Sequence, residues 1–216
     1  MHFFDIENIL VTVFGYPLSY VECIGTIMGL FAVWFAAKQH IITWPASLIN
    51  VTCFFAVFYQ VQLYSDMFLQ VYFFGISVYG WVIWKMQKQE GKPIQRLSNK
   101  QRIQILIWIA ALTGIFGYFI QHLHDYFPSV FQHPAAFPYV DSFIAVASIF
   151  ANTLLARRIF ENWVLWIVID AICIFVYALK HILFISFEYF IFFFMASYGL
   201  YEWVKIMKDE KRLSTR

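Results

Sequence analysis

Seven long apolar runs constrain this chain more than any other feature of its sequence. Each holds roughly 20 residues, the length that an α-helix needs to cross about 30 Å of hydrocarbon. Only 13% of the residues are charged, against about 25% in ordinary soluble domains. The runs are also too long, and lack the polar–apolar alternation, for an outer-membrane barrel. The sequence therefore predicts an all-α polytopic membrane protein with seven transmembrane helices, at approximately residues 18–37, 41–62, 66–85, 103–121, 140–156, 162–180 and 183–204.

The first residues lack the basic segment of a cleavable signal peptide, because Asp5 and Glu7 stand there instead. We expect a short amphipathic segment over residues 1–15 that lies on the membrane interface. Its apolar residues are Ile6, Ile9, Leu10, Val13 and Phe14.

The basic residues predict the topology, because cytoplasmic loops carry an excess of Lys and Arg. With seven spans, all but one of the 15 Lys and Arg residues fall on the same side of the membrane. The exception is Lys180, at the outer end of the sixth span, where its long side chain can reach the interface. The pattern predicts an outside N-terminus and a cytoplasmic C-terminus.

An internal repeat is visible at an offset of 119 residues. The matched positions are Glu22 with Asp141, Lys38 with Arg157, Trp44 with Trp163, Tyr79-Gly80 with Tyr198-Gly199, and Trp84 with Trp203. Spans one to three therefore resemble spans five to seven. The alternative is that membrane helices share Trp and Tyr at their interfaces in any case.

The repeat predicts two three-helix bundles joined by a single linker helix. One intervening span gives the bundles the same orientation, so they form a 3+1+3 arrangement of parallel repeats, which is found in transporters. The predicted segments are an interfacial segment (1–15), a first bundle (16–86), a cytoplasmic linker (87–102), a linker helix (103–122), an outer loop (123–139), a second bundle (140–205) and a cytoplasmic tail (206–216).

A carboxylate lies deep inside the sixth span. Asp170 stands about eight residues into the helix, or ~12 Å down its axis. At 100° per residue, Trp163, Trp166 and Tyr177 fall within roughly 60° of the same face. A flat cationic molecule would find a counter-charge and aromatic faces on this stripe. The alternative is that the two indoles pack against neighbours while Asp170 bonds to a polar residue of the bundle.

Amides in the first bundle reach a similar depth. Asn50 lies about nine residues into the second span, after Trp44 and one turn before Phe54, and Gln70 lies in the third span. Sites of repeat transporters are expected near the midplane between the two halves, which favours a binding role. The alternative is a helix-to-helix hydrogen bond, since such amides hold membrane helices together.

Other reactive residues give weaker patterns. His122, His124 and His133 lie with Asp125 in the outer loop, and this spacing favours a solvated loop over a metal site. The three cysteines, Cys23, Cys53 and Cys173, lie in apolar runs without disulfide or metal spacing. We expect no metal, no cofactor and no nucleic-acid partner.

Several motifs together resemble the PnuC family of bacterial nicotinamide riboside transporters, and the resemblance covers essentially all seven spans. The motifs are Trp44-Pro45 followed by Asn50, the run from Tyr64 to Gln70, the run from Tyr79 to Trp84, and Glu161-Asn162-Trp163-Val164-Leu165-Trp166 with Asp170. The resemblance implies two three-helix bundles related to SWEET sugar transporters, a bacterial inner-membrane location and a homo-oligomer. It also implies passage of nicotinamide riboside by facilitated diffusion, with trapping by a cytosolic nicotinamide riboside kinase rather than enzymatic activity of the chain itself.

The physical reading of the residues agrees with that substrate. Nicotinamide riboside carries a pyridinium cation, a carboxamide and ribose hydroxyls, which match aromatic faces, a carboxylate and amides. A phosphate would meet Asp170 with like charge, so we expect the mononucleotide to be rejected. The candidate substrate-binding residues are Trp163, Trp166, Asp170, Tyr177, Asn50, Phe54, Gln70, Trp44 and Tyr198.

Two alternatives stay open on the sequence. The same stripe suits another cationic vitamin, such as thiamine, because that molecule also carries a positive aromatic ring. An intramembrane enzyme or assembly subunit is the second, and an enzyme would need a general base with a partner in reach. The acidic candidates for that base are Glu22, Asp66, Asp141, Asp170 and Glu188.

Overall fold

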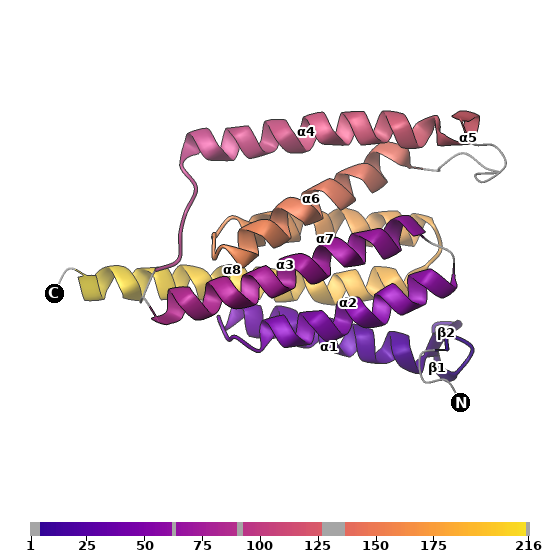
Figure 1. Cartoon of the computed structure of the whole chain (residues 1–216), viewed down its shortest axis with the longest axis horizontal. Coiled ribbons are helices and arrows are strands. Elements are labelled where there is room, and N and C mark those ends of the chain that lie inside the picture. Colours follow the sequence, from indigo (N-terminus) through magenta and orange to yellow (C-terminus); the bar gives the residue numbers. More distant parts are fainter. Residues whose placement is uncertain (1–4, 62–63, 90–92, 127–136, 215–216) are drawn as a thin grey trace.

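The structure is a computed structural model that describes residues 5–61, 64–89, 93–126 and 137–214. Eight helices and one β-hairpin make up these residues (Figure 1). The hairpin pairs β1 (Ile9–Val13) with β2 (Tyr16–Ser19) in antiparallel orientation. The helices are α1 (Tyr20–Ala37), α2 (Thr43–Gln60), α3 (Tyr64–Gln89), α4 (Asn99–Gln121), α5 (Leu123–Tyr126), α6 (Pro138–Ala156), α7 (Asn162–Leu179) and α8 (Leu183–Ser214).

Two helices begin with the same capping box. Ser19 precedes α1 and Ser98 precedes α4, and each serine hydroxyl accepts from the backbone N–H three residues later. The side chain of that later residue, Glu22 or Gln101, accepts from the serine N–H in return. The exchange satisfies backbone donors that a helix start would otherwise leave unpaired.

Two helices end in the same way, 119 residues apart. Gln39 follows α1 with φ 52°, and Arg158 follows α6 with φ 56°. In each case the next N–H donates back to a carbonyl of the last helical turn, as in a Schellman motif. The side chains of these two residues also meet, because the Arg158 guanidinium donates to the Gln39 amide oxygen.

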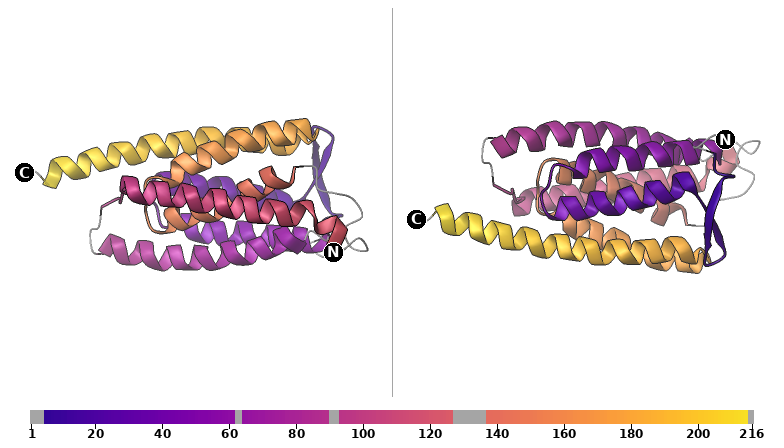
Figure 2. Two further views of the ribbon diagram at one scale, coloured as in Figure 1. Left: turned by 90° about the horizontal axis from the view of Figure 1, so that it is seen from above. Right: turned by 90° about the horizontal axis from the view of Figure 1, so that it is seen from below.

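Six of the helices form a closed ring. Along the ring, α1 packs on α2, α2 on α3, α3 on α6, α6 on α7, α7 on α8, and α8 on α1. The remaining long helix, α4, lies along the outside of α6 (Figure 1). The N- and C-terminal labels lie at opposite ends of the bundle in all views (Figures 1 and 2).

The chain is a multi-pass membrane protein. Among the described helices, α1, α3, α4, α6, α7 and α8 are long and apolar enough to cross a membrane, which makes six candidate spans. The predicted second span coincides with α2, which has 18 residues like α1. Polar residues such as Asn50 and Thr52 lower the hydropathy of α2. The seventh span and the orientation of the termini therefore remain predictions.

A tryptophan core closes one end of the ring, and it contains equivalent contacts from both halves of the chain. Trp44 packs edge-on against Trp84, with ring centroids 5.2 Å apart, and Trp163 packs likewise against Trp203 at 5.7 Å. The indole N–H of Trp84 donates to Leu155 in α6 at 3.1 Å. That of Trp203 donates to Ala36 in α1, also at 3.1 Å, so each half bonds to the other. These positions are again 119 residues apart.

The predicted interfacial segment, residues 1–15, contains β1 and the turn of the β-hairpin, whereas β2 lies at the start of the predicted first bundle. The two-residue turn, Phe14-Gly15, has φ values of 49° and 80°, the signature of a tight hairpin turn. Tyr16 stacks on Phe184 of α8 at 5.3 Å, and the Ile6 N–H donates to Gln60 of α2 at 3.1 Å. The hairpin thus spans one end of the bundle from α8 to α2 (Figure 2). Its position on a membrane interface stays a prediction.

The linker between α3 and α4 is fastened to the turn between α6 and α7. Gln95 exchanges backbone hydrogen bonds with both Arg158 and Phe160 in that turn. Glu161 accepts from the Leu97 N–H at 3.1 Å and pairs with the guanidinium of Arg102 at 2.7 Å. The second half of the chain is therefore held to the start of α4 at this end.

Candidate functional site

Asp170 lies in the middle of α7 with only 3% of its surface exposed. Its neighbours Ile169 and Cys173 are fully buried in an apolar cluster. Within the described residues, its carboxylate forms no ion pair and no hydrogen bond, although the Cys173 thiol and the Tyr189 hydroxyl lie within electrostatic range. The hydrogen bond to a polar residue of the bundle, which the sequence left open, is thus not formed here. A buried carboxylate without a partner is costly in a membrane, which marks Asp170 as the centre of a candidate site.

Aromatic rings extend from Asp170 toward α8. Tyr177 of α7 stacks on Tyr189 of α8, with centroids 5.5 Å apart and planes 7° apart. Phe192 meets the edge of Tyr189 at 6.3 Å. Tyr177 was predicted from its spacing, whereas Tyr189 and Phe192 were not. They lie in a run of phenylalanines in which no residue stands out, so the adjacent Glu188 was the one available signal.

Asn50 reaches the same region from α2. Its amide nitrogen donates to the Gly25 carbonyl of α1 at 2.8 Å, so part of the amide joins the two helices. The side chain also lies over Gly29, where an added Cβ would stand 2.8 Å from the Asn50 nitrogen and 3.7 Å from Phe192. Asn50 and Phe192 therefore converge on one glycine, and this brings the first half of the chain next to the aromatic rings of the second.

The two other first-bundle candidates are placed differently. Phe54 lies over Gly25, where a Cβ would be 3.0 Å from its ring. Gln70 is half-buried in α3, and within the described residues no hydrogen bond joins it to Asp170. Two residues on, the Tyr72 hydroxyl bonds to Thr153 of α6 at 2.7 Å and thereby fastens α3 to α6.

Trp44 and Trp163 are each enclosed by protein. Both are 1% exposed, and their rings pack on Gly80 and Gly199 respectively. Neither indole has a ring face free for a ligand in this conformation. The structure therefore separates Trp163, in the tryptophan core, from Asp170 and Tyr177, which lie deeper. Trp166 is half-buried and contacts both clusters, so it lies between the two groups.

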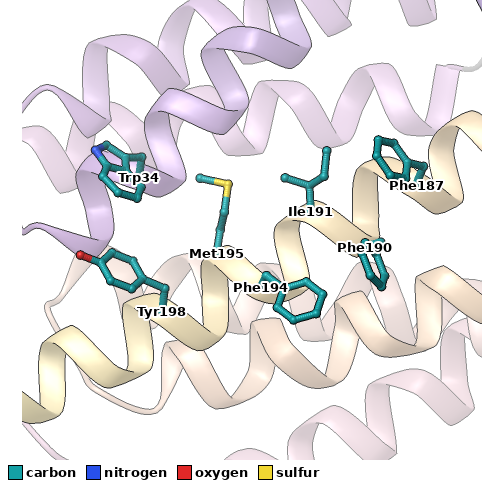
Figure 3. A pocket seen from close by; sticks show the side chains of 7 residues that line it. All are labelled: Trp34, Phe187, Phe190, Ile191, Phe194, Met195 and Tyr198. Atoms are coloured by element: carbon teal, nitrogen blue, oxygen red, sulfur yellow. The ribbon is translucent and has the colours of Figure 1, made fainter.

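Tyr198 lies away from Asp170, in a groove between α1 and α8 (Figure 3). The groove has a volume of about 380 Å³ and is lined by apolar and aromatic side chains. Its lining residues are Trp34, Phe187, Phe190, Ile191, Phe194, Met195 and Tyr198. Tyr198 thus belongs to the surface of the α1–α8 seam and not to the aromatic group around Asp170.

The other charged candidates are engaged in local contacts. Glu22 accepts from both Ser19 and Tyr16 at the start of α1. Asp141 pairs with Lys180 at 3.2 Å, and the ammonium also lies 5.7 Å from the Tyr177 ring. Burial and the hydrogen bond to Glu22 raise the pKa of Tyr16, so its phenol stays protonated. Both carboxylates are therefore engaged by neighbouring donors.

The histidine group gives no metal site within the described residues, where no three His, Cys, Asp or Glu side chains gather. The ring of His122 bonds to the Tyr118 carbonyl at 2.9 Å. His133 lies outside the described residues.

Comparison with known proteins places this arrangement in a family. The nicotinamide riboside transporter PnuC of Escherichia coli (strain K12) is 33% identical over 231 residues, which cover 97% of both chains. The riboflavin/roseoflavin transporter RibM of Streptomyces davaonensis (strain DSM 101723 / JCM 4913 / KCC S-0913 / 768) is 23% identical, over 88% of this chain and 87% of RibM. A crystal structure of the vitamin B3 transporter PnuC shares the fold, with a TM-score of 0.69 at 21% identity, over 88% of this chain and 83% of that one.

These relatives are transporters and not enzymes. A family model described as nicotinamide mononucleotide transporter matches residues 19–205, which include the ring helices α1, α2, α3, α6 and α7 and the part of α8 up to Lys205. The chain therefore belongs to the nicotinamide mononucleotide transporter family.

Proposed function

We propose that this protein carries nicotinamide riboside across the bacterial inner membrane by facilitated diffusion. The observation that carries the proposal is Asp170, a buried carboxylate with no cationic partner among the described residues, in a chain related to nicotinamide riboside transporters. A pyridinium cation supplies the missing positive charge, and burial strengthens their attraction because the surroundings have a low dielectric.

The neighbouring groups suit the rest of this substrate. Tyr177 and Tyr189 offer aromatic faces to the pyridinium ring, which favours cation–π contact. Asn50 supplies an amide for the carboxamide or the ribose hydroxyls. We assign Trp166 to the same site, because it contacts the cluster that holds Ile169 and Cys173.

The remaining predicted residues would act around this centre. We propose that Trp44 and Trp163 become accessible when the tryptophan core opens, since protein groups cover both in the present conformation. Phe54 and Gln70 would line the path from the first bundle, and Tyr198 would meet the substrate at the α1–α8 seam.

The membrane arrangement that fits this role is the 3+1+3 plan. In it α1–α3 and α6–α8 are parallel bundles, α4 is the linker helix, and α2 is a seventh span. The equivalent tryptophan contacts and matching helix ends support the repeat. Termini at opposite ends of the bundle support an odd number of spans, with the N-terminus outside by the distribution of Lys and Arg (Figure 1).

Movement of substrate would follow from alternating access of the two bundles. The ring is closed at one end by tightly packed tryptophans, so passage requires the bundles to part there. No coupling ion is needed if a cytosolic kinase phosphorylates the substrate, because the added phosphate would be repelled by Asp170 and could not return. We also expect a homo-oligomer, on family resemblance alone.

The charge of the substrate distinguishes nicotinamide riboside from the alternatives. The mononucleotide adds a phosphate that Asp170 disfavours, although the family description names that molecule. Riboflavin, which the relative RibM carries, has an uncharged ring and would leave Asp170 unpaired. Thiamine keeps the positive charge and is the closest competitor by this criterion.

Calorimetry with the purified protein tests the proposal. Nicotinamide riboside, nicotinamide mononucleotide, thiamine and riboflavin are titrated separately, and uptake of the best ligand is measured in proteoliposomes. We expect nicotinamide riboside to bind at least tenfold more tightly than the other three. Tighter binding of thiamine would mean that the substrate is another cationic vitamin. Tighter binding of the mononucleotide or riboflavin would contradict the role given to Asp170.

A further inference from the structure

An ammonium group lies beside two aromatic rings at the seam between α1 and α8. The Lys38 nitrogen lies 5.4 Å from the ring centroid of Trp34 and 4.8 Å from that of Tyr198. The two rings stack on each other, with centroids 5.3 Å apart and planes 10° apart. Because the ammonium donates to the Tyr198 hydroxyl, it lies at the hydroxyl edge of that ring and not over its face. We call Trp34, Tyr198 and Glu202 the cage, since an aromatic ring beside a carboxylate is an arrangement by which proteins bind organic cations.

A carboxylate completes the cage. Lys38 donates a hydrogen bond to the Tyr198 hydroxyl, which in turn donates to Glu202 at 2.9 Å. The carboxylate also lies 3.6 Å from the Lys38 nitrogen and is 17% exposed, against 40% for the lysine side chain. The hydrogen bond to Tyr198 raises the pKa of Lys38, so the cage holds a charged ammonium at neutral pH.

Space for a second molecule adjoins the cage. Trp34 and Tyr198 are also lining residues of the groove between α1 and α8 (Figure 3). The groove volume of about 380 Å³ lies within the ~300–1,000 Å³ of small-molecule pockets. A flat ring that replaced the lysine ammonium would therefore have an apolar groove beside it.

The equivalent seam in the other half of the chain lacks these features. The positions 119 residues from Trp34 and Glu202 are Thr153 and Ile83, which supply neither an aromatic face nor a charge. At that seam, between α3 and α6, Thr153 instead bonds to Tyr72. A basic residue follows both helices, since Arg157 corresponds to Lys38. A lysine that only marked the membrane edge would not need such neighbours, and of these two seams the α1–α8 seam alone has them in the part of the chain that the structure describes.

We propose that Trp34, Tyr198 and Glu202 form a second site for a flat organic monocation, in which Lys38 acts as a tethered occupant that an incoming cation displaces. The inference rests on the proposed function, because a pyridinium substrate is such a cation. Lys38 joins α1 to α8, so its displacement would also remove the ionic link across this seam.

Removal of the tethered occupant tests the site. The probe is 1-methylnicotinamide, a pyridinium that lacks ribose, and the matched control is uncharged nicotinamide. Both are titrated by calorimetry into the full chain carrying Asp170→Asn, which takes away the charge of the deeper site. We expect Lys38→Met to tighten binding of the cation by about threefold to tenfold, the range of a cation–π contact, and to leave nicotinamide unchanged.

Further variants distinguish an effect on the cage from an effect of general unfolding. Lys38→Arg keeps a cation in the cage and should bind the probe as weakly as the parent chain does. Adding Trp34→Leu to Lys38→Met should abolish the gain, whereas Trp34→Phe should keep most of it. Equal binding of the probe to Lys38→Met and to the parent, with both chains folded by circular dichroism, would overturn the inference.

Transport of nicotinamide riboside by the unmodified chain is measured separately. It distinguishes a failure of the second site from a failure of the proposed function. If nicotinamide riboside is taken up but Lys38→Met gains nothing, only the second site is wrong. If the gain appears while nicotinamide riboside is not transported, the cage stands as a cation site and the proposed substrate is wrong.

Discussion

At the scale of single residues, the central feature is Asp170, a buried carboxylate without a counter-charge among the described residues. Its carboxylate is almost wholly buried, and the described residues form neither an ion pair nor a hydrogen bond with it. Insertion of an aspartate into a membrane helix costs on the order of 2.5–3.5 kcal/mol. A residue retained for packing alone would not carry that cost, whereas a cationic ligand offsets it each time it binds.

Neutralisation of Asp170 should therefore stabilise the ligand-free protein. We expect Asp170→Asn to raise the midpoint of thermal unfolding by about 2–4 °C, the shift that ~1 kcal/mol gives in a chain of this size. Asp141→Asn is the matched control, because Asp141 is paired with Lys180, and it should leave the midpoint unchanged or lower it. A fall in the midpoint for Asp170→Asn would mean that the carboxylate has a stabilising partner.

The residue-level site was predicted only in part. The helical period predicts that Asp170 and Tyr177 share one face of α7, and Tyr177 packs against the cluster that contains Ile169 and Cys173, the neighbours of Asp170. The period does not reveal what packs opposite a residue, so it could not show that Gly199 and Trp203 enclose Trp163. Tyr189 was missed because it comes from another helix, in a run of phenylalanines where its position does not stand out.

At the scale of helices, two tryptophan–glycine contacts set how closely the second and third helices of each half approach. An added Cβ at Gly80 would lie 2.3 Å from the Trp44 ring, and one at Gly199 would lie 2.6 Å from Trp163. Both distances are below any ordinary contact, and the rings are held by further tryptophans. The glycines are therefore needed for close approach and not for backbone conformation.

Alanine at these glycines should destabilise the protein. We expect Gly80→Ala and Gly199→Ala each to cost about 1–3 kcal/mol through overpacking, measured as lower midpoints of thermal unfolding in detergent. Gly75→Ala is the matched control on α3, because nothing lies within 4 Å of its added Cβ. It should be neutral or stabilising by up to ~1 kcal/mol from helix propensity. Equal effects at Gly75 and Gly80 would refute the packing argument.

The predicted spans match the helices within a few residues at every end but one, because apolar length and local end signals such as Ser19 with Glu22 can be read in the sequence. The exception is α8, which continues to Ser214, past the predicted end at residue 204. The hairpin was not predicted as such. Apolar periodicity over so short a segment does not distinguish an interfacial segment from strands, and the signal that was overlooked is the turn at Phe14-Gly15.

At the scale of the whole molecule, the two halves are joined reciprocally. Trp84 of the first half bonds to Leu155 of the second, and Trp203 of the second bonds to Ala36 of the first. The offset of 119 residues indicated that the halves are alike. It could not indicate that α3 would pack on α6 and α8 on α1, because apolar contacts within and between bundles have the same sequence pattern.

The proposed topology makes a prediction about the two faces of the membrane. Alkaline phosphatase, which is active only outside the cytoplasm, should be active when fused after Gln121, at the end of α4. It should be inactive when fused after Arg216, where green fluorescent protein should fluoresce. Active phosphatase at the C-terminus would contradict an odd number of spans with an outside N-terminus.

The central claim is that Asp170 selects a positively charged nicotinamide nucleoside. It is tested most directly by uptake of nicotinamide riboside into proteoliposomes, set beside uptake of its reduced, uncharged form, which has nearly the same shape. The account predicts that the wild-type protein prefers the cation by at least tenfold and that Asp170→Asn removes most of this preference. Equal uptake of both forms by the wild type, or an unchanged preference in Asp170→Asn, would contradict it.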